Sequence, residues 1–408
     1  MSNESIVIVG AGHAGGRAAQ AMRAAGFEGA VILVGEEAYQ PYERPPLSKE
    51  LLQTDDGLER ARLHDPAWYE EHDIELLTGA RATAIDTGAK TVTLIDGGTL
   101  SYDKLLLTTG ARVRELPISG ADLPEVHYLR DYEDTKAIRA RLTPDARVVV
   151  IGGGFIGLEC AASARSRGCA VTVLEAADRL MGRAVAPEIG KHFEEIHRGH
   201  GVDLRLGAKI VEIDGYGKVA SVVLDDDEPV PADVVVIGIG ILPNVELAQE
   251  AGIACENGIT VDAFGRTSDP NVWAAGDVAN QPNAFLGRQV RLESYQNAQD
   301  QAMAVARNMV GEEPTPYEDS LWVWTDQYDV NLQMLGMPEG YDELVWRGDP
   351  AAGAFTLFYM KAGKIVAVNT VNSGRDMGAC KRLIATGKSF DPTQLADPEV
   401  KLIKLAKG

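Results

Sequence analysis

Two stretches of the chain show the same order of apolar and polar segments. Residues 147–175 begin with a β-branched apolar run, pass through a glycine-rich turn and a helix-compatible segment, and end with a second apolar run closed by Glu175. Residues 6–36 repeat this order and end at Glu36. The order predicts strand, glycine turn, helix and strand, which is the βαβ unit of dinucleotide-binding folds. We therefore expect two such units in one chain.

The glycines of both turns have the spacing that such a unit requires. In the second unit they are Gly152, Gly154 and Gly157, and in the first, 142 positions earlier (152 minus 10), they are Gly10, Gly12 and Gly15. They allow a tight turn, close approach of the backbone to a pyrophosphate and close packing of helix on strand. One such turn also occurs for packing alone, but two complete units favour two dinucleotides, most commonly FAD with a nicotinamide nucleotide.

The acid that closes the second unit predicts the coenzyme. A carboxylate at Glu175 would accept hydrogen bonds from ribose hydroxyls and would repel a 2′-phosphate. The residues that follow it offer no cation before Arg179. We therefore expect NADH rather than NADPH.

The remaining pattern predicts an α/β protein with a third domain. Residues 72–110 and 208–240 alternate apolar runs with turn signals, including a hairpin turn at 96–98, and from about residue 319 the chain becomes tryptophan-rich and then strand-like. Helices are expected after Pro46, over 293–309 and near 375–386. The fold class is α/β, with two Rossmann-like domains and a C-terminal α+β domain. The expected bounds are 1–112 and 238–318 for a discontinuous FAD-binding domain, 113–237 for an NADH-binding domain and 319–408 for the C-terminal domain.

Composition restricts the possible partners and the location. The 408 residues suit two to three domains, and 45% hydrophobic with 24% charged residues is ordinary for a globular protein. A net charge of −21 argues against nucleic acid. No apolar run of about 18 residues predicts a membrane span, and the first strand begins at about Ser5, too early for a secretory signal. We expect a cytoplasmic protein that binds neither nucleic acid nor membrane.

Neither the cysteines nor the histidines suggest a metal site. The four cysteines have no metal-like spacing, and none follows the first unit at the place where disulfide and peroxide reductases carry a thiol beside the flavin. His192, His197 and His200 are spaced by 5 and then 3 residues, which does not place all three on one face of a helix. We expect a polar amphipathic helix face there instead.

The motifs together resemble the FAD- and NADH-dependent ferredoxin reductases that serve cytochrome P450 and Rieske-type oxygenases, the putidaredoxin reductase family. The resemblance covers nearly the whole chain and rests on GAGHAG (10–15), YERPPLSK (42–49), LLLTTGARVR (105–114), VVVIGGGFIGLE (148–159), VWAAGDVA (272–279), ESYQNAQDQA (293–302) and WVWTDQYDVNLQMLG (322–336). It implies a glutathione-reductase type of fold, FAD and NADH as cofactors, a [2Fe–2S] ferredoxin as partner, and a monomer or weak homodimer.

The resemblance also implies the site residues. Those expected at FAD are Gly10, Gly12, His13, Ala14, Gly15, Glu36, Arg44, Pro45, Lys49, Thr109, Gly110, Arg130, Gly276, Asp277, Ser294, Tyr295 and Trp324. Those expected at NADH are Gly152, Gly154, Phe155, Ile156, Gly157, Glu159, Glu175, Gly238, Ile239 and Gly240. The expected catalytic residues are Lys49 and Glu159, paired near the flavin N5, and Trp324 near the flavin and the ferredoxin.

Several alternatives stay open at this point. Lys49 and Glu159 could be surface residues at helix starts, Asp277 could cap a helix, and Trp324 could be a core aromatic. The electron acceptor could be a rubredoxin or a quinone-like molecule. In a different class, the chain could be an NADH-gated interaction protein of the apoptosis-inducing factor type, which would favour long targeting or basic segments.

Overall fold

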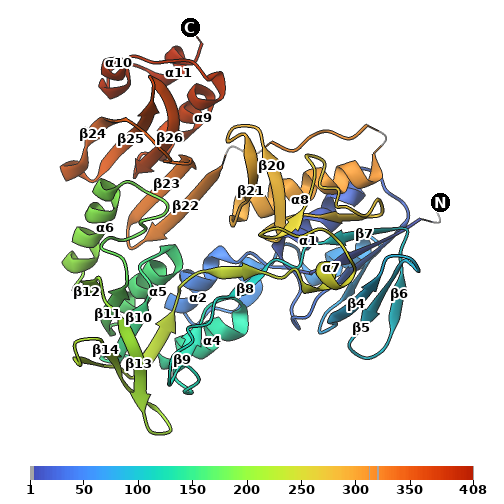
Figure 1. Ribbon diagram of the computed structural model, residues 1–408, viewed down its shortest axis with the longest axis horizontal. Coiled ribbons are helices and arrows are strands. Elements are labelled where there is room, and N and C mark those ends of the chain that lie inside the picture. The colour runs from blue at the N-terminus through green and yellow to red at the C-terminus, as the bar shows by residue number, and fades with distance from the viewer. Residues whose placement is uncertain (1–3, 312, 319–320, 408) are drawn as a thin grey trace. The chain divides into compact units, whose positions relative to one another are not determined.

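The computed structural model describes residues 4–311, 313–318 and 321–407, which pack into two compact units. The first unit takes its residues from 1–45, 57–112 and 241–319, and the second from 46–56, 113–240 and 320–408. Each unit therefore combines segments that are distant in the sequence, as the mixed colours within each show (Figure 1).

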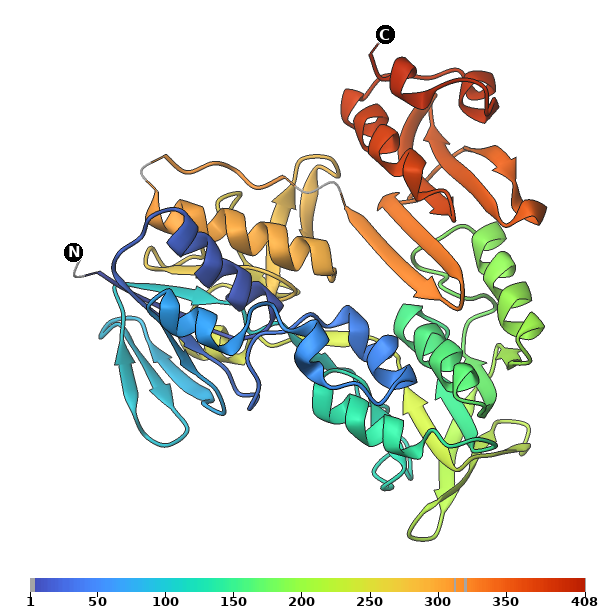
Figure 2. The same ribbon diagram turned by 180° about the vertical axis from the view of Figure 1, so that it is seen from behind.

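The first unit is built around a five-stranded parallel sheet with the order β19-β7-β1-β2-β3. Its strands are β1 (Ser5–Val9), β2 (Ala30–Val34), β3 (Ile74–Leu77), β7 (Lys104–Leu107) and β19 (Val272–Ala274). Alternate residues of β1 enter two different cores: Ile6 and Ile8 pack towards α1 (His13–Ala24) and α8 (Tyr295–Val310), and Val7 and Val9 pack on the opposite face. A strand buried on both faces needs a continuous apolar run, which is why the sequence shows one. The helices α1 and α8 lie side by side (Figure 2).

Smaller elements complete the first unit. One antiparallel sheet contains β4 (Ala82–Asp86), β5 (Thr91–Leu94) and β6 (Thr99–Ser101), and the predicted hairpin turn at 96–98 joins the last two. A second small sheet contains β18 (Ile259–Thr260), β20 (Ala279–Asn283) and β21 (Arg288–Arg291). The strands β8 (Ala111–Val113) and β17 (Ile241–Pro243) pair with each other, and the remaining helices are α3 (Pro66–Glu71) and α7 (Glu246–Glu250).

The second unit repeats this architecture. Its parallel sheet has the order β12-β11-β10-β16-β9, formed by β9 (Val126–Tyr128), β10 (Arg147–Ile151), β11 (Ala170–Glu175), β12 (Asp203–Leu206) and β16 (Val234–Ile237). The helix α5 (Phe155–Ser166) follows β10, as α1 follows β1. In both units a three-stranded antiparallel sheet interrupts the parallel one, here β13 (Ile210–Gly215), β14 (Val219–Leu224) and β15 (Pro229–Pro231). The repeat predicted from the glycines is thus a repeat of topology.

The C-terminal segment adds an antiparallel sheet to the second unit. Its order is β22-β23-β26-β25-β24, formed by β22 (Trp322–Gln327), β23 (Val330–Gly336), β24 (Glu343–Asp349), β25 (Ala354–Lys361) and β26 (Lys364–Val371). Phe358 and Met360 face a core with α9 (Met377–Thr386), and Phe355 and Leu357 share a core with α5 and α6 (Pro187–Gly199). The short helices α10 (Pro392–Ala396) and α11 (Leu402–Leu405) close the segment.

A short segment between the two parts of the first unit packs into the second. Residues 46–56 contain α2 (Glu50–Gln53), and α4 (Tyr132–Arg141) holds them through one guanidinium. Arg139 donates to the carbonyls of Leu51, Thr54 and Asp56 at 3.0, 3.0 and 2.9 Å. The start of a helix after Pro46 is confirmed, and so are the predicted helices that became α8 and α9.

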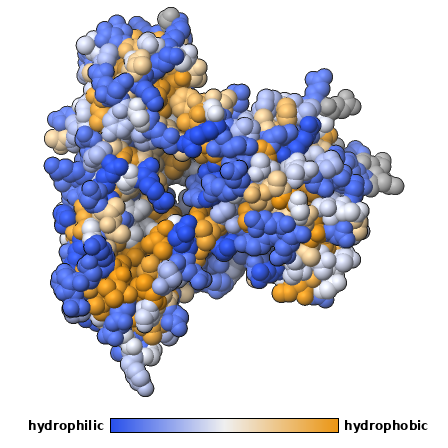
Figure 3. Space-filling view, in the orientation of Figure 1, coloured by the Kyte–Doolittle hydropathy of each residue, from blue (hydrophilic) through white to orange (hydrophobic). Residues whose placement is uncertain are grey.

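The visible face of the surface is mostly hydrophilic (Figure 3). Hydrophilic residues cover much of the visible face, and hydrophobic ones gather on the second unit around β10, β13 and β14 (Figure 3), where Val211 on β13 is 54% exposed. Across the described ranges no helix is both long and apolar enough to cross a bilayer.

The glycine turn of the second unit shows why two of its glycines cannot be replaced. Gly152 has φ +112°, a conformation that side chains rarely adopt. A Cβ on Gly157 would lie 2.1 Å from the carbonyl oxygen of Gly152. A Cβ on Gly154, by contrast, would meet nothing within 4 Å on the protein. Gly157 therefore serves packing, and Gly154 leaves space open.

We predict that Gly157→Ala destabilises the second unit and that Gly154→Ala does not. The steric cost of overpacking, about 1–3 kcal/mol, exceeds the roughly 1 kcal/mol that alanine gains in a helix. Thermal unfolding of the FAD-loaded protein should show a midpoint lower by about 3 °C or more for Gly157→Ala. Gly154→Ala should keep the midpoint and weaken NADH binding instead, and equal midpoints for both variants would contradict this assignment.

Candidate functional site

The residues expected at FAD gather around the first glycine turn, apart from Lys49, Arg130 and Trp324, which belong to the second unit. Gly10 has φ +116°, and Thr108 donates to its carbonyl at 2.8 Å. The next residues, Thr109 and Gly110, are fixed by Asn244, which accepts from the Thr109 hydroxyl at 2.8 Å and donates to the Thr109 carbonyl at 2.9 Å. These contacts hold the loop after β7 beside the turn.

Two further segments of the first unit reach the same turn. A Cβ on Gly276 would lie 3.0 Å from the Cβ of Ala14, and the Gly276 N–H donates to Gln301 of α8 at 2.8 Å. Ser294 caps α8 by accepting from the Asn297 N–H at 3.0 Å. Asp277 caps no helix, because the strand β20 follows it.

A buried histidine lies within this turn, directly after Gly12. His13 is 7% exposed, and neither of its ring nitrogens has a hydrogen-bond partner within the part of the chain that the structure describes. Burial, with smaller effects of Arg17 and Arg44, lowers its pKa to about 3, so the imidazole is neutral. Its ring lies 4.3 Å from that of Tyr295, whose hydroxyl donates to Glu43 at 2.7 Å. Buried polar atoms without partners are expected where a ligand supplies them.

The acids that close the two units are not equivalent. Gly10 donates to the carbonyl of Val34 at 2.8 Å, and Gly152 donates to that of Leu174 at 2.8 Å. Val34 and Leu174 are therefore equivalent positions, and the residue after each makes Gly35 the counterpart of Glu175. Glu36 lies one residue further on; it is 69% exposed and lies 3.5 Å from Arg81. The apparent match between the two terminal acids is therefore displaced by one residue, and the role of Glu36 at FAD stays a prediction.

Glu175 is held at the tip of β11. Its carboxylate accepts from the Gly153 N–H at 2.5 Å and from the Ala177 N–H at 2.7 Å. The loop after β16 closes the same turn, because Gly238 donates to the Ile151 carbonyl at 2.8 Å and a Cβ on Gly152 would lie 2.4 Å from the Gly238 carbonyl oxygen. Ile239 and Gly240 follow directly.

The other residues expected at the nucleotides lie at element starts. Phe155 and Ile156 begin α5, and Ile156 is 47% exposed although it is apolar. Arg130 precedes α4, with its backbone N–H donating to Asp134 at 2.8 Å. In the first unit Pro45 begins a 3-10 turn, and Arg44 lies 2.6 Å from Glu37.

The structure brings Lys49 and Glu159 together in the second unit. The Lys49 Nζ lies 3.4 Å from Glu159 Oε1 and 3.7 Å from Asp326 Oδ2. Lys49 is 9% exposed and Glu159 is 4% exposed, so they are not surface residues. The Glu159 carboxylate also accepts from the hydroxyls of Ser48 and Thr325, the latter at 2.6 Å.

The surroundings of Glu159 act on its charge in opposite directions. Burial raises the pKa of the carboxyl, and Lys49, Ser48 and Thr325 partly offset this by favouring the ionised form. An unpaired buried carboxylate would protonate, whereas one with a cation and two hydroxyl donors can stay ionised. The site therefore holds a carboxylate whose charge depends on its partners.

Trp324 extends this cluster. Lys49 Nζ lies 5.7 Å from the centre of its ring, and the ring of Trp322 stacks on it at 5.1 Å. Lys381 covers the other ring at 4.6 Å. Trp324 is half-buried, so it is not a core aromatic.

Sequence reasoning missed several residues of this cluster. Ser48 and Thr325 carry no signal of their own within their motifs. Buried Thr325 and Gln327 alternate with half-buried neighbours along β22, a period-2 pattern that could have indicated a buried polar face. The expectation of a polar helix face is wrong for His197, which is fully buried and lies 2.8 Å from Gln327. Spacing along one helix does not reveal what packs against it.

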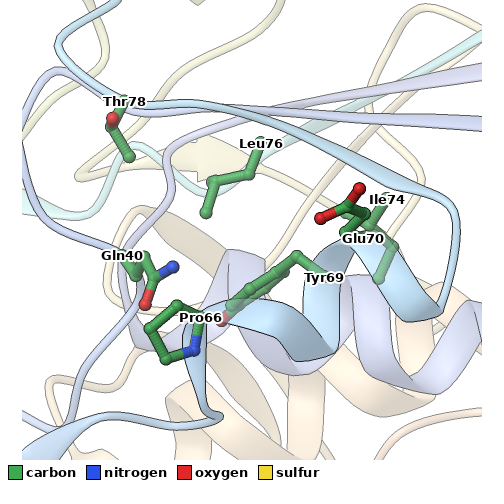
Figure 4. A pocket seen from close by; sticks show the side chains of 7 residues that line it. All are labelled: Gln40, Pro66, Tyr69, Glu70, Ile74, Leu76 and Thr78. Carbon is green, nitrogen blue, oxygen red and sulfur yellow. The ribbon is translucent and has the colours of Figure 1, made fainter.

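The first unit also contains a surface cavity of about 360 Å³, shown in Figure 4. It is lined by Gln40, Pro66, Tyr69, Glu70, Ile74, Leu76 and Thr78. None of the residues expected at a cofactor lines it, so cavity volume does not locate the candidate site.

Comparison with known proteins decides the family. Residues 4–302 match the family model described as pyridine nucleotide-disulphide oxidoreductase, and residues 322–406 match that described as reductase C-terminal. The chain is 47% identical to the ferredoxin–NAD(+) reductase component of the anthranilate 1,2-dioxygenase system of Burkholderia cepacia, over 98% of this chain and 99% of that one. The chain belongs to the pyridine nucleotide-disulphide oxidoreductase family.

Further relatives of this family cover the same length. Putidaredoxin reductase of Pseudomonas putida is 40% identical, over 98% of this chain and 96% of that one. Among solved structures, the ferredoxin reductase for the CYP199A2 system of Rhodopseudomonas palustris has a TM-score of 0.96 at 40% identity, covering 99% of this chain and 100% of that one. The reductase in the covalent putidaredoxin reductase–putidaredoxin complex has the same score at 39% identity, with both chains fully covered.

The protein is thus a ferredoxin reductase-type flavoprotein oxidoreductase that uses FAD and NAD(H), as the family does. The residues present fit both nucleotides. The unpartnered ring nitrogens of His13 lie beside one glycine turn, and Gly154 leaves space open at the other.

We predict a preference for NADH over NADPH that depends on Glu175. Because its carboxylate is fixed at the strand tip, it should exclude a 2′-phosphate, and kcat/KM should be at least about tenfold higher with NADH. Glu175→Ala should reduce this ratio, mainly by lowering efficiency with NADH. The check is steady-state kinetics with both coenzymes, and similar efficiencies for the unaltered protein would contradict it.

Proposed function

We propose that the protein passes electrons from NADH to a [2Fe–2S] ferredoxin that serves a cytochrome P450 or Rieske-type oxygenase. The family and the relatives named above support this function, and the buried Lys49–Glu159 pair is the observation that carries the mechanism. When bound, FAD accepts hydride from NADH and releases electrons singly. We assign FAD to residues 1–112 and 238–318, NADH to 113–237, and keep 319–408 as the C-terminal domain.

We infer that Glu159 binds the nicotinamide carboxamide. It lies two residues after Gly157, in the helix whose N-terminus receives the nucleotide, and its carboxylate can accept from an amide N–H. Lys49 is held between Glu159 and Asp326, so the cluster keeps one cation between two carboxylates. Binding of NADH is then coupled to the charge of Glu159.

Trp324 supplies a second proposed role. Its half-buried ring is stacked on Trp322 and faces Lys49, which gives a rigid aromatic surface next to the ion pair. We propose that this surface shields the reacting groups from water and lies towards the ferredoxin. The four cysteines are unpaired, which supports a reducing, cytoplasmic location, and we propose a monomer or weak homodimer.

We predict that Lys49→Met slows reduction of the flavin by NADH at least about tenfold, since a preorganised charge is removed and Glu159 is left buried without its cation. Stopped-flow absorbance of the FAD-loaded protein measures this rate. Lys136→Met is the matched control, because the Lys136 side chain is 38% exposed and pairs with Glu133 at 2.7 Å. A change within about threefold for Lys49→Met would contradict the assignment.

A second experiment tests the acceptor. The NADH-reduced protein should be oxidised rapidly by a [2Fe–2S] ferredoxin and about tenfold or more slowly by a rubredoxin or a quinone. Sequential-mixing stopped-flow follows both reactions. A long-lived reduced flavin–NAD complex that is indifferent to ferredoxin would instead indicate an NADH-gated interaction protein.

A further inference from the structure

A buried histidine on α6 lies outside the residues assigned above. His197 is fully buried, its Nε2 lies 2.8 Å from Gln327 Oε1, and its Nδ1 lies 3.2 Å from the Tyr328 hydroxyl. Burial lowers the pKa of His197, so the ring is neutral and donates from one nitrogen only. The two partners therefore decide which nitrogen carries the proton.

The hydrogen bonds have one direction from His197 to Glu159. An ionised Glu159 can only accept, so the Thr325 hydroxyl at 2.6 Å donates to it. Thr325 Oγ1 in turn accepts from Gln327 Nε2 at 3.2 Å. The remaining amide atom, Gln327 Oε1, accepts from the Nε2–H of His197. The residues from His197 to Glu159 thus form a hydrogen-bond chain in which each donor points towards the Glu159 carboxylate.

We propose that His197 and Gln327 are positioning residues that orient the Thr325 hydroxyl towards Glu159 and so keep this buried carboxylate ionised. The groups are neutral and act through aligned dipoles, which favour the charged form of the acceptor in a site that excludes water. The inference rests on the role proposed for Glu159 and deepens it. It joins α6 and β22, two elements without a residue assigned to NADH, to the state of the NADH site.

Other titratable and charged groups face this hydrogen-bond chain. They are Lys49 before α2, Cys160 and Arg165 on α5, His200 directly after α6, Asp326 on β22 and Tyr328 directly after β22. Burial raises the pKa of Tyr328 to about 12 and that of the Cys160 thiol as well, so both stay neutral. These surrounding groups are unchanged in every variant below, so differences between the variants come from the hydrogen-bond chain.

The test uses Gln327→Leu and His197→Leu, with His192→Leu as the matched control on the same helix. His192 packs edge-on against Phe355, with ring centres 5.3 Å apart, and is not part of the hydrogen-bond chain. Infrared difference spectra of the FAD-loaded protein without NADH would follow the protonated carboxyl of Glu159 with pH. The band is assigned by its loss in Glu159→Gln.

Gln327→Leu and His197→Leu should each raise the midpoint of Glu159 protonation by about one pH unit, as expected when one hydrogen bond to a charged group is weakened. Protonation weakens Glu159 as an acceptor for the nicotinamide carboxamide, because the hydrogen bond is no longer charge-assisted, so the decline in the rate of flavin reduction on lowering the pH should begin at a correspondingly higher pH. His192→Leu should leave the midpoint unchanged. His197→Gln, whose amide can still donate to Gln327, should restore it.

An unmoved midpoint in folded Gln327→Leu would overturn the proposal, even if His197→Leu failed to fold. The role proposed for Glu159 in NADH binding fails separately, if Glu159→Gln reduces its flavin as fast as the unaltered protein. In either case the infrared midpoint of Glu159 tests whether His197 and Gln327 act on this carboxylate.

Discussion

One buried carboxylate, that of Glu159, joins three separate segments of the second unit. Glu159 is 4% exposed, and a carboxylate removed from water to this extent needs a cation and donors with good geometry. No single element supplies them: Lys49 and Ser48 come from residues 46–56, and Thr325 comes from β22. Through these contacts residues 46–56 and the C-terminal sheet are both joined to the same helix, α5.

The fold could be predicted to a large extent because its signals are local. A strand buried on both faces must be apolar throughout, and a tight turn before a helix must use glycine where φ is positive or where a Cβ would touch a carbonyl. Gly152 and Gly157 meet these conditions in the structure. The parallel sheets, the hairpins and the main helices follow from such patterns.

The site could be predicted only where a motif or a family resemblance carried it. Lys49 and Glu159 are 110 residues apart (159 minus 49), and nothing local in either segment indicates the other. The counterpart of Glu175 is Gly35 because the backbone register decides it, which counting from the last apolar residue does not reveal. His197 is fully buried and bonded to Gln327 of β22, a contact that joins residues 130 positions apart.

The two units differ most at one equivalent helix position. Two residues after the third glycine, the first unit has Arg17 and the second has Glu159. Both find their partners within residues 43–49: Arg17 lies 3.4 Å from Glu43, and Glu159 lies 3.4 Å from Lys49. The same topology thus presents a cation after one glycine turn and an anion after the other. Because a carboxylate can accept from a carboxamide and a guanidinium cannot, this exchange of sign supports the proposal that the nicotinamide binds at the second unit.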